Sequence, residues 1–275
     1  MKRLLAIALS LPLPSFIALS ALAQSPATPA NSALSNAEAV HVSSIKELRK
    51  GAGEWPLIAN ADNSAEQRVN ATLTRMNLRL PRAIEDCDQS YLASLKQMGS
   101  QTHHQNPVSK DWSRTIKVTM AGPRFLSLVA TDETFCGGAH PVNDQIAMVF
   151  DLTTGAPVNW VALLPTSTGA SAYSDTATDG TTMGALILPA LQAASLAAAD
   201  ADCKDAFQDP QPFLIWPDAK RGILVAQSFD LPHVVQACAN EVDLTVDLAR
   251  KMGFSESLLG AIIQAHRPFA VKPKQ

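Results

Sequence analysis

Two turn motifs separated by a short apolar segment constrain the fold of this chain more than any other feature. The first is Cys136-Gly-Gly-Ala-His-Pro141, which follows the apolar stretch Arg124–Ala130. The second is Asp151-Leu-Thr-Thr-Gly155, which lies between the apolar segments Ile146–Phe150 and Val158–Leu163. Apolar runs bounded by turn residues at this spacing predict consecutive antiparallel strands.

The turn residues have individual structural reasons for their places. Gly137 and Gly138 can adopt positive φ at no steric cost, so they permit a sharp reversal beside Ala139 and Pro141. Asp151 is expected to accept a hydrogen bond from a backbone N–H two residues on, and Gly155 to let the chain return. These residues are therefore predicted to be structural.

The order of strand, GGAHP turn, strand and D-x-T-x-G turn resembles an uncharacterised bacterial extracellular domain family. That domain forms the outer part of the anti-sigma-V factor, a lysozyme receptor, and precedes the catalytic domain of some peptidoglycan deacetylases. The resemblance covers roughly residues 116–263 and is strongest over 124–163. It implies cell-wall or lysozyme-like partners, and it carries over no contact residue.

Periodicity along the rest of the chain predicts helices and further strands. Val69, Leu73, Met76 and Leu80 recur at helical spacing, which predicts a helix over 65–80 that begins at a Ser64 capping box and ends at Pro81. The other expected elements are helices over 87–98, 186–199 and 255–265, strands over 115–120, 212–216, 222–226 and 242–246, and a surface loop over 165–182. Strands without regular alternation with helices favour an α+β fold, an antiparallel sheet with flanking helices.

The N-terminus predicts export. Residues 1–23 have a basic start, an apolar run and the sequence Ala21-Leu-Ala23, which together are typical of a secretory signal peptide. Pro12 and Pro14 argue against the alternative, a membrane anchor. The expected organisation is signal peptide 1–23, disordered leader 24–40, helical companion region 41–113, α+β domain 114–266 and tail 267–275, in the periplasm.

All four cysteines follow the predicted signal peptide. An even number of cysteines in an exported chain indicates disulfides, and four cysteines allow three pairings. We favour Cys87–Cys136 and Cys203–Cys238, because each bridge would join neighbouring segments of one half of the chain. No close cysteine pair suggests a metal site.

The charge and the missing motifs exclude several classes of function. The formal net charge of −3 becomes −5 once Lys2 and Arg3 are removed, and no basic stripe offers a nucleic-acid surface. The sequence has no phosphate loop, dinucleotide fingerprint, H-E-x-x-H motif or nucleophile elbow. No cofactor or metal is expected, and no segment after the signal peptide is long and apolar enough to span a bilayer.

His140 is the candidate functional residue, because a histidine beside two glycines suits an acid, a base or a ligand. The alternative is that its ring holds the turn by a hydrogen bond. Three weaker candidates exist. His103 and His104 are candidate metal ligands with Asp132 or Asp151. The others are the carboxylate pairs Asp86/Asp88 and Asp132/Glu133, and a carbohydrate platform of Trp55, Trp112, Trp160 and Trp216. For each of these a structural role is the simpler explanation.

The sequence thus predicts a secreted envelope module that binds or senses a ligand and is not an enzyme. Peptidoglycan and an envelope protein are the expected partners. An envelope hydrolase centred on His140 and a purely structural envelope protein are the alternatives.

Overall fold

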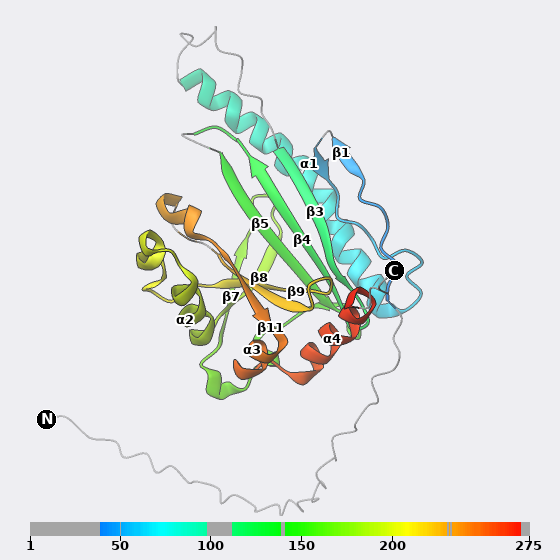
Figure 1. The fold of residues 1–275 in the computed structure, drawn as a ribbon. Helices are drawn as coiled ribbons and strands as arrows, with labels where there is room; N and C mark the ends of the chain where they lie inside the picture. Colours follow the sequence, from blue (N-terminus) through cyan, green and yellow to red (C-terminus); the bar gives the residue numbers. More distant parts are fainter. Residues whose placement is uncertain are drawn as a thin grey trace, which may run out of the picture. The chain divides into compact units, whose positions relative to one another are not determined.

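The computed structural model describes residues 39–49, 51–97, 112–138, 141–229, 231 and 233–270. They form two β-sheets with flanking helices (Figure 1). This is the predicted α+β fold, and the two sheets are antiparallel except for one short pairing. The predicted signal peptide lies outside the described residues, as does most of the leader.

The first sheet has the strand order β1-β2-β3-β4-β5-β6. Its strands are β1 (Glu47–Arg49), β2 (Ala52–Gly53), β3 (Trp112–Ala121), β4 (Phe125–Thr134), β5 (Val142–Asp151) and β6 (Ala156–Pro157). The ladder of β3, β4 and β5 confirms the predicted strands and extends each of them. In register, Ile116 pairs with Ala130, which pairs with Ile146.

The strand predicted over Val158–Leu163 is wrong. Strand β6 ends at Pro157, and the chain turns into a 3₁₀ helix, η2 (Val161–Leu163). Trp160 is buried at this turn, so burial of its large side chain competes with continued pairing.

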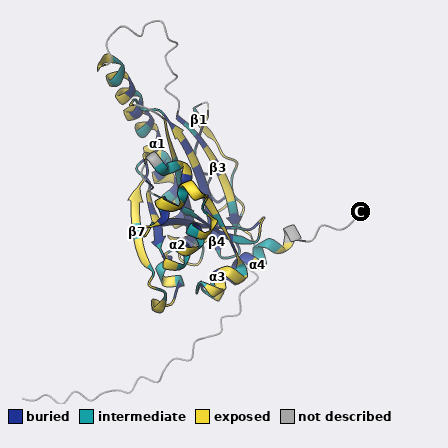
Figure 2. Cartoon of the chain, turned by 60° about the vertical axis from the view of Figure 1, so that its left-hand side comes forward, coloured by how far each residue is buried: buried dark blue, intermediate teal, exposed yellow. Residues whose placement is uncertain are grey.

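The second sheet has the order β11-β10-β9-β8-β7. Its strands are β7 (Ser171–Thr176), β8 (Thr182–Ile187), β9 (Phe213–Asp218), β10 (Ile223–Ser228) and β11 (Glu241–Thr245). The predicted hairpin of β9 and β10 is confirmed. The loop expected over 165–182 is wrong, because it contains η3 (Thr166–Thr168) and the edge strand β7. Most of β7 is exposed (Figure 2), which explains why it lacks the apolar alternation of a half-buried strand.

One long helix, α1 (Ser64–Gln97), replaces the two helices predicted on either side of Pro81. Proline removes one hydrogen bond from a helix interior. The apolar stripe nevertheless continues through Leu80, Ile84, Cys87 and Tyr91, and its burial offsets that loss.

The cap of α1 is also one residue earlier than predicted. The Asn63 side chain, not Ser64, accepts hydrogen bonds from the N–H groups of Ala65 and Glu66, each at 3.0 Å. Asparagine and serine are both good caps, so sequence alone does not choose between neighbours.

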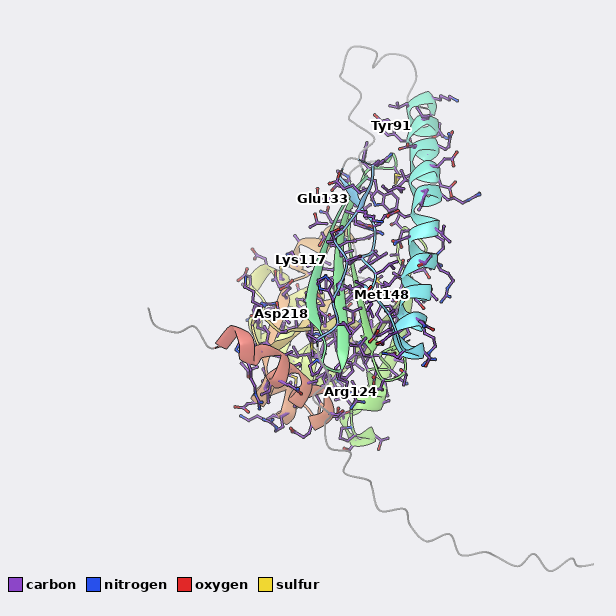
Figure 3. The ribbon with its side chains drawn as sticks, turned by 90° about the vertical axis from the view of Figure 1, so that its right-hand side faces the viewer. Tyr91, Lys117, Arg124, Glu133, Met148 and Asp218 are labelled. Carbon is purple, nitrogen blue, oxygen red and sulfur yellow. A yellow bond between two sulfur atoms is a disulfide. The ribbon has the colours of Figure 1, made fainter. Side chains whose placement is uncertain are left out.

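Strand β4, in the middle of the first sheet, is buried on both faces. All residues of β4 from Phe125 to Ala130 are buried, where a sheet with one solvated face would alternate. Strand β9 crosses β3, β4 and β5, and α1 covers the other side (Figure 3). The remaining helices are α2 (Pro189–Ala198), α3 (Val246–Lys251), α4 (Glu256–Ala270), η4 (Ala201–Phe207) and η5 (His233–Cys238).

Both favoured disulfides are confirmed. Cys87–Cys136 joins α1 to the segment after β4, and Cys203–Cys238 joins η4 to η5. Pairing of all four cysteines is typical of a protein that folds in an oxidising compartment.

Candidate binding groove

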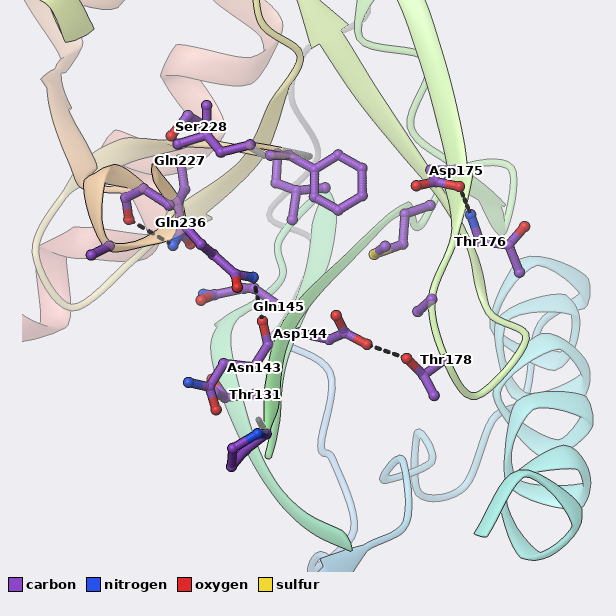
Figure 4. Close-up of a pocket in the computed structure, with 18 residues that line it drawn as sticks. Thr131, Asn143, Asp144, Gln145, Asp175, Thr176, Thr178, Gln227, Ser228 and Gln236 are labelled. Carbon is purple, nitrogen blue, oxygen red and sulfur yellow. Dashed lines mark hydrogen bonds between the residues drawn. The ribbon is translucent and has the colours of Figure 1, made fainter. Parts of the chain in front are cut away.

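A groove of about 600 Å³ opens where the two sheets separate. Its walls are the C-terminal part of β4, the N-terminal end of β5, the hairpin of β7 and β8, and the C-terminal end of β10 with the turn after it (Figure 4). Hydroxyl, amide and carboxylate side chains dominate the polar part of the lining: Thr131, Asn143, Asp144, Gln145, Asp175, Thr176, Thr178, Gln227, Ser228 and Gln236. The volume lies within the range of small-ligand sites.

The groove exists because the second sheet divides. Strands β8 and β9 pair only at Leu186 and Phe213, whereas β9 and β10 pair over their full length. The hairpin of β7 and β8 therefore diverges from the rest of its sheet towards its tip at Ala177–Thr181. Met183 and Leu214 line the space between the two parts.

A buried ion cluster holds the hairpin tip against the first sheet. Arg114 of β3 donates from Nε to Asp132 Oδ1 at 2.6 Å, and from Nη2 to Asp179 Oδ2 of the tip at 2.7 Å. The side chains of Arg114 and Asp179 have no exposed surface. Asp179 also accepts a hydrogen bond from the backbone N–H of Thr181, which fixes the turn itself. The guanidinium lies 5.6 Å from the ring centroid of Trp55.

Charge and burial act against each other in this cluster. Burial alone would lower the pKa of Arg114, but the hydrogen bonds and charges of Asp132 and Asp179 outweigh burial and raise it. Burial raises the pKa of Asp132 against the pull of Arg114, and the charges of Asp179 and Asp144 act in the same direction as burial. A bidentate guanidinium between two carboxylates is a rigid anchor rather than a catalytic arrangement.

Further hydrogen bonds close the ends of the groove. The Thr178 hydroxyl donates to Asp144 Oδ2 of β5, and Gln236 Nε2 donates to the carbonyl of Asn143 at 3.2 Å (Figure 4). Asp175 accepts a bond from the backbone N–H of Thr176 at 2.6 Å. The walls are thus connected to β5 from two sides.

Two polar atoms of the groove have no partner within the described part of the chain. They are Gln227 Oε1 and Ser228 Oγ, both inaccessible to solvent or nearly so. Ser228 is 4% exposed. A buried hydroxyl or carbonyl without a hydrogen bond costs about 1–3 kcal/mol. Both residues line the groove, so these two side chains lie close to any ligand that the groove holds.

The structure describes part of the predicted turn motif. Gly137 and Gly138 have φ of +93° and +111°, and Gly155 has φ of +71°. Pro141 lines the groove. Asp151 accepts the N–H of Thr153 at 2.8 Å, the local bond expected of it.

The histidines that the sequence suggests as functional residues lie in segments that the structure does not describe. Ala139 and His140 lie outside the described residues, as do His103 and His104, so the role of His140 stays a prediction. Among the described residues, no three histidine, cysteine, aspartate or glutamate side chains group closely enough to hold a metal ion.

Several weaker candidates have structural roles. Asp132 is committed to the buried ion cluster, so it is not half of an exposed carboxylate pair. Trp55, Trp112, Trp160 and Trp216 are each at most 5% exposed, and they form core contacts rather than a carbohydrate platform.

The groove residues themselves were not singled out from the sequence. They come from β4, β5, β7, β10 and the segment around η5, and no local motif links these segments. The one available signal was polar residues inside strand-like stretches, such as Asp144-Gln145 before Ile146 and Gln227-Ser228 after Val225. Sequence spacing cannot show that these pairs face each other.

Within the residues that the structure describes, no helix combines the length and apolar character needed to cross a membrane. No family model matches the sequence, and no curated protein matches it. Among solved structures, the chain is similar to a crystal structure of a member of the DUF3298 family from Bacteroides fragilis NCTC 9343. The identity is 11% and the TM-score 0.48, over 82% of this chain and 96% of that chain. At this level the similarity assigns neither family nor activity to the chain.

Proposed function

We propose that this protein is a secreted binding module of the cell envelope and that the groove between its sheets is the binding site. The observation that carries the proposal is a groove of about 600 Å³ lined largely by polar side chains, among them Gln227 and Ser228, each of which has a buried oxygen without a partner among the described residues. The buried Arg114 cluster supports it, because that cluster holds one wall of the groove rigidly in place.

The proposed compartment and partners are inferred from the sequence and the disulfides together. The predicted signal peptide, the two bridges and the turn motifs favour a periplasmic protein whose ligand belongs to the envelope. Peptidoglycan or an envelope protein is the proposed source of that ligand, in line with the resemblance of residues 124–163.

A matched pair of serine substitutions tests the proposal. Ser228 and Ser195 are both 4% exposed, and both have an Oγ atom without a partner among the described residues. Only Ser228 lines the groove, whereas Ser195 lies in α2. Co-sedimentation of the secreted full-length protein with purified peptidoglycan, and its retention of envelope proteins, are measured for Ser228→Ala and Ser195→Ala.

We expect Ser228→Ala to weaken binding by about fivefold to tenfold, since one ligand hydrogen bond is lost, and Ser195→Ala to bind as the wild type does. Equal binding by all three proteins would remove the groove as the site. Absence of binding to both preparations would remove the binding function.

A further inference from the structure

A row of four arginines runs along the exposed face of α1. The row consists of Arg68, Arg75, Arg79 and Arg82, and all four residues are exposed. Steps of seven, four and three residues return to the same side of an α-helix, so the four side chains share one face. Figure 3 shows side chains of α1 that project away from the sheets.

Acidic side chains do not neutralise this arginine row. Residues 67–84 contain the four arginines and no aspartate or glutamate. Within the described part of the chain, the one carboxylate in ion-pair contact with the row is Asp86, at 3.7 Å from Arg82, and both side chains are exposed. An exposed pair of this kind contributes little. The row therefore presents a line of positive charge on a chain whose formal net charge is −3.

The expectation of no basic stripe is wrong for this one helix face. The chain as a whole is acidic, and a helix that ends at Pro81 separates Arg82 from the other three arginines. Because α1 continues through Pro81, Arg82 joins the row. Like charges three and four residues apart destabilise a helix, so Arg75, Arg79 and Arg82 repel one another along α1. A bound anion would remove that repulsion.

A hollow of about 470 Å³ lies beside the C-terminal end of the arginine row. Arg79 and Arg82 line it from α1, and Thr178 and Gly180 line it from the tip of the β7 and β8 hairpin. A Cβ built on Gly180 would lie 3.9 Å from Arg79 Cδ, so the stem of Arg79 lies beside this tip. Two cations at a concave surface strengthen the local positive potential. The hollow thus suits an anionic group.

Leu78 adds an apolar contact to the same hollow. Its side chain is 73% exposed, and no large apolar side chain in the described ranges is more exposed. Sugar rings have apolar C–H faces beside their polar groups, whereas inorganic phosphate has none. An exposed leucine next to arginines therefore favours an anionic sugar over a simple inorganic anion.

The shape of the arginine row favours a linear partner over a membrane surface. The rise of an α-helix places Arg75, Arg79 and Arg82 at successive steps of about 6 and about 4.5 Å along the axis. A helix that lies on a membrane buries a whole apolar face in the lipid. Among the exposed residues of 67–84, only Leu78 has a large apolar side chain.

We propose that the outer face of α1 binds a linear acidic polysaccharide, whose carboxylates pair with the arginine row and one of whose sugars occupies the hollow beside Arg79 and Leu78. The row uses arginine throughout, and a guanidinium binds a carboxylate by two parallel hydrogen bonds. The hollow shares only Thr178 of its described lining with the groove between the sheets. This site therefore goes beyond the proposed function and does not rest on it.

Isothermal titration of the full-length protein with oligogalacturonate, and with the same chain methyl-esterified, tests the charge of the ligand. Esterification removes the carboxylate charges and leaves the sugar backbone unchanged. We expect it to weaken binding at least about tenfold, and we expect the affinity for the acidic chain to fall as the salt concentration rises. Equal affinity for the two chains, or binding of neither, would overturn the proposal.

A matched pair of arginine substitutions locates the site. Arg79→Gln removes one charge from the row, and Arg267→Gln removes one exposed charge from α4. We expect about threefold weaker binding of oligogalacturonate for Arg79→Gln and no change for Arg267→Gln. The melting temperature of Arg79→Gln should not fall, because repulsion along α1 decreases. Equal loss of affinity in both variants would show a response to net charge alone and overturn the site.

A substitution at Asp86 should act in the opposite direction. Asp86 lines the hollow and carries the one carboxylate in contact with the row, so it opposes an anionic ligand. We expect Asp86→Asn to bind oligogalacturonate about twofold to threefold more tightly. Unchanged or weaker binding would contradict the placement of a carboxylate in this hollow.

Other ligands and the other site give different results. Binding of phosphatidylglycerol vesicles that depends on Arg79, without binding of oligogalacturonate, would replace the polysaccharide by a membrane surface and overturn the proposal. Ser228→Ala should leave the affinity for oligogalacturonate unchanged, because Ser228 lines the groove and not the hollow. A loss in that variant, with none in Arg79→Gln, would place the polymer in the groove and overturn the site on α1.

Discussion

The two glycines of the first turn have the same backbone preference and different surroundings. A Cβ at Gly137 would lie 2.1 Å from Ser94 Oγ and 2.9 Å from Ser94 Cβ, whereas a Cβ at Gly138 would meet nothing within 4 Å. Both have positive φ, which costs a non-glycine residue about 1 kcal/mol. The backbone of the turn therefore favours glycine at both positions. At Gly137 the close approach of Ser94 in α1 also leaves no room for a side chain.

Gly137→Ala is therefore expected to lower the free energy of unfolding by about 2–4 kcal/mol, and Gly138→Ala by about 1 kcal/mol. Urea unfolding of both variants measures the difference. Gly184→Ala is the control, since that glycine has neither a positive φ nor a close neighbour. Equal losses at Gly137 and Gly138 would show that the contact with Ser94 relaxes without cost.

The unpartnered hydroxyl of Ser228 predicts a separation of stability from binding. Because Oγ has no partner among the described residues, Ser228→Ala removes a desolvated polar group and leaves no bond broken. The variant is expected to be as stable as the wild type or up to about 2 kcal/mol more stable. A thermal melt that shows clear destabilisation would mean that Oγ has a structural bond, and the groove argument would lose its main support.

Arg114 and Asp179 differ in what their loss leaves behind. Arg114→Met would leave two buried carboxylates without a cation, and we expect it to lower the free energy of unfolding by about 3–5 kcal/mol. Asp179→Asn leaves Arg114 paired with Asp132, but in either orientation the amide NH₂ faces a buried donor, Thr181 N–H or Arg114 Nη2. We therefore expect a smaller loss, of about 1–3 kcal/mol. Similar losses in urea unfolding would contradict the ion-cluster account.

At the scale of elements, the sequence predicts the helices and strands correctly where apolar side chains recur at a clear period. The strands β3, β4 and β5 and the hairpin of β9 and β10 were predicted because apolar residues recur between turn residues. Strand β7 was missed because an exposed edge strand buries too little to leave a pattern, and α1 was divided because burial of its stripe outweighs the local effect of Pro81. The division at residue 113 into a companion region and a domain stays a prediction.

The two disulfides link elements of the fold covalently, and a titration of free thiols tests them. The protein, purified and unfolded without reductant, should show no reactive thiol, and with reductant it should show four. Replacing both cysteines of either bridge by alanine should lower the free energy of unfolding by about 2–4 kcal/mol, since loops of 49 and 35 residues are closed. Two free thiols before reduction would contradict the pairing.

At the scale of the whole molecule, the α+β class followed from the order of predicted elements, but the groove did not. It depends on β9 crossing the first sheet and on the hairpin of β7 and β8 leaving the second, and neither is encoded in local periodicity. Asp144, Asp175, Gln227 and Ser228 become one site only through that arrangement. Among the described residues of the predicted turn motifs, Pro141 alone lines it.

The central claim is that the groove between the sheets binds an envelope ligand, and mapping by NMR tests it most directly. Soluble peptidoglycan fragments are titrated into the isotopically labelled protein, and amide shifts are followed. The account predicts saturable shifts at Gln145, Asp175, Gln227 and Ser228, with residues on the exposed face of α4 unchanged. Saturable shifts confined to another surface, with these four amides unmoved, would contradict it.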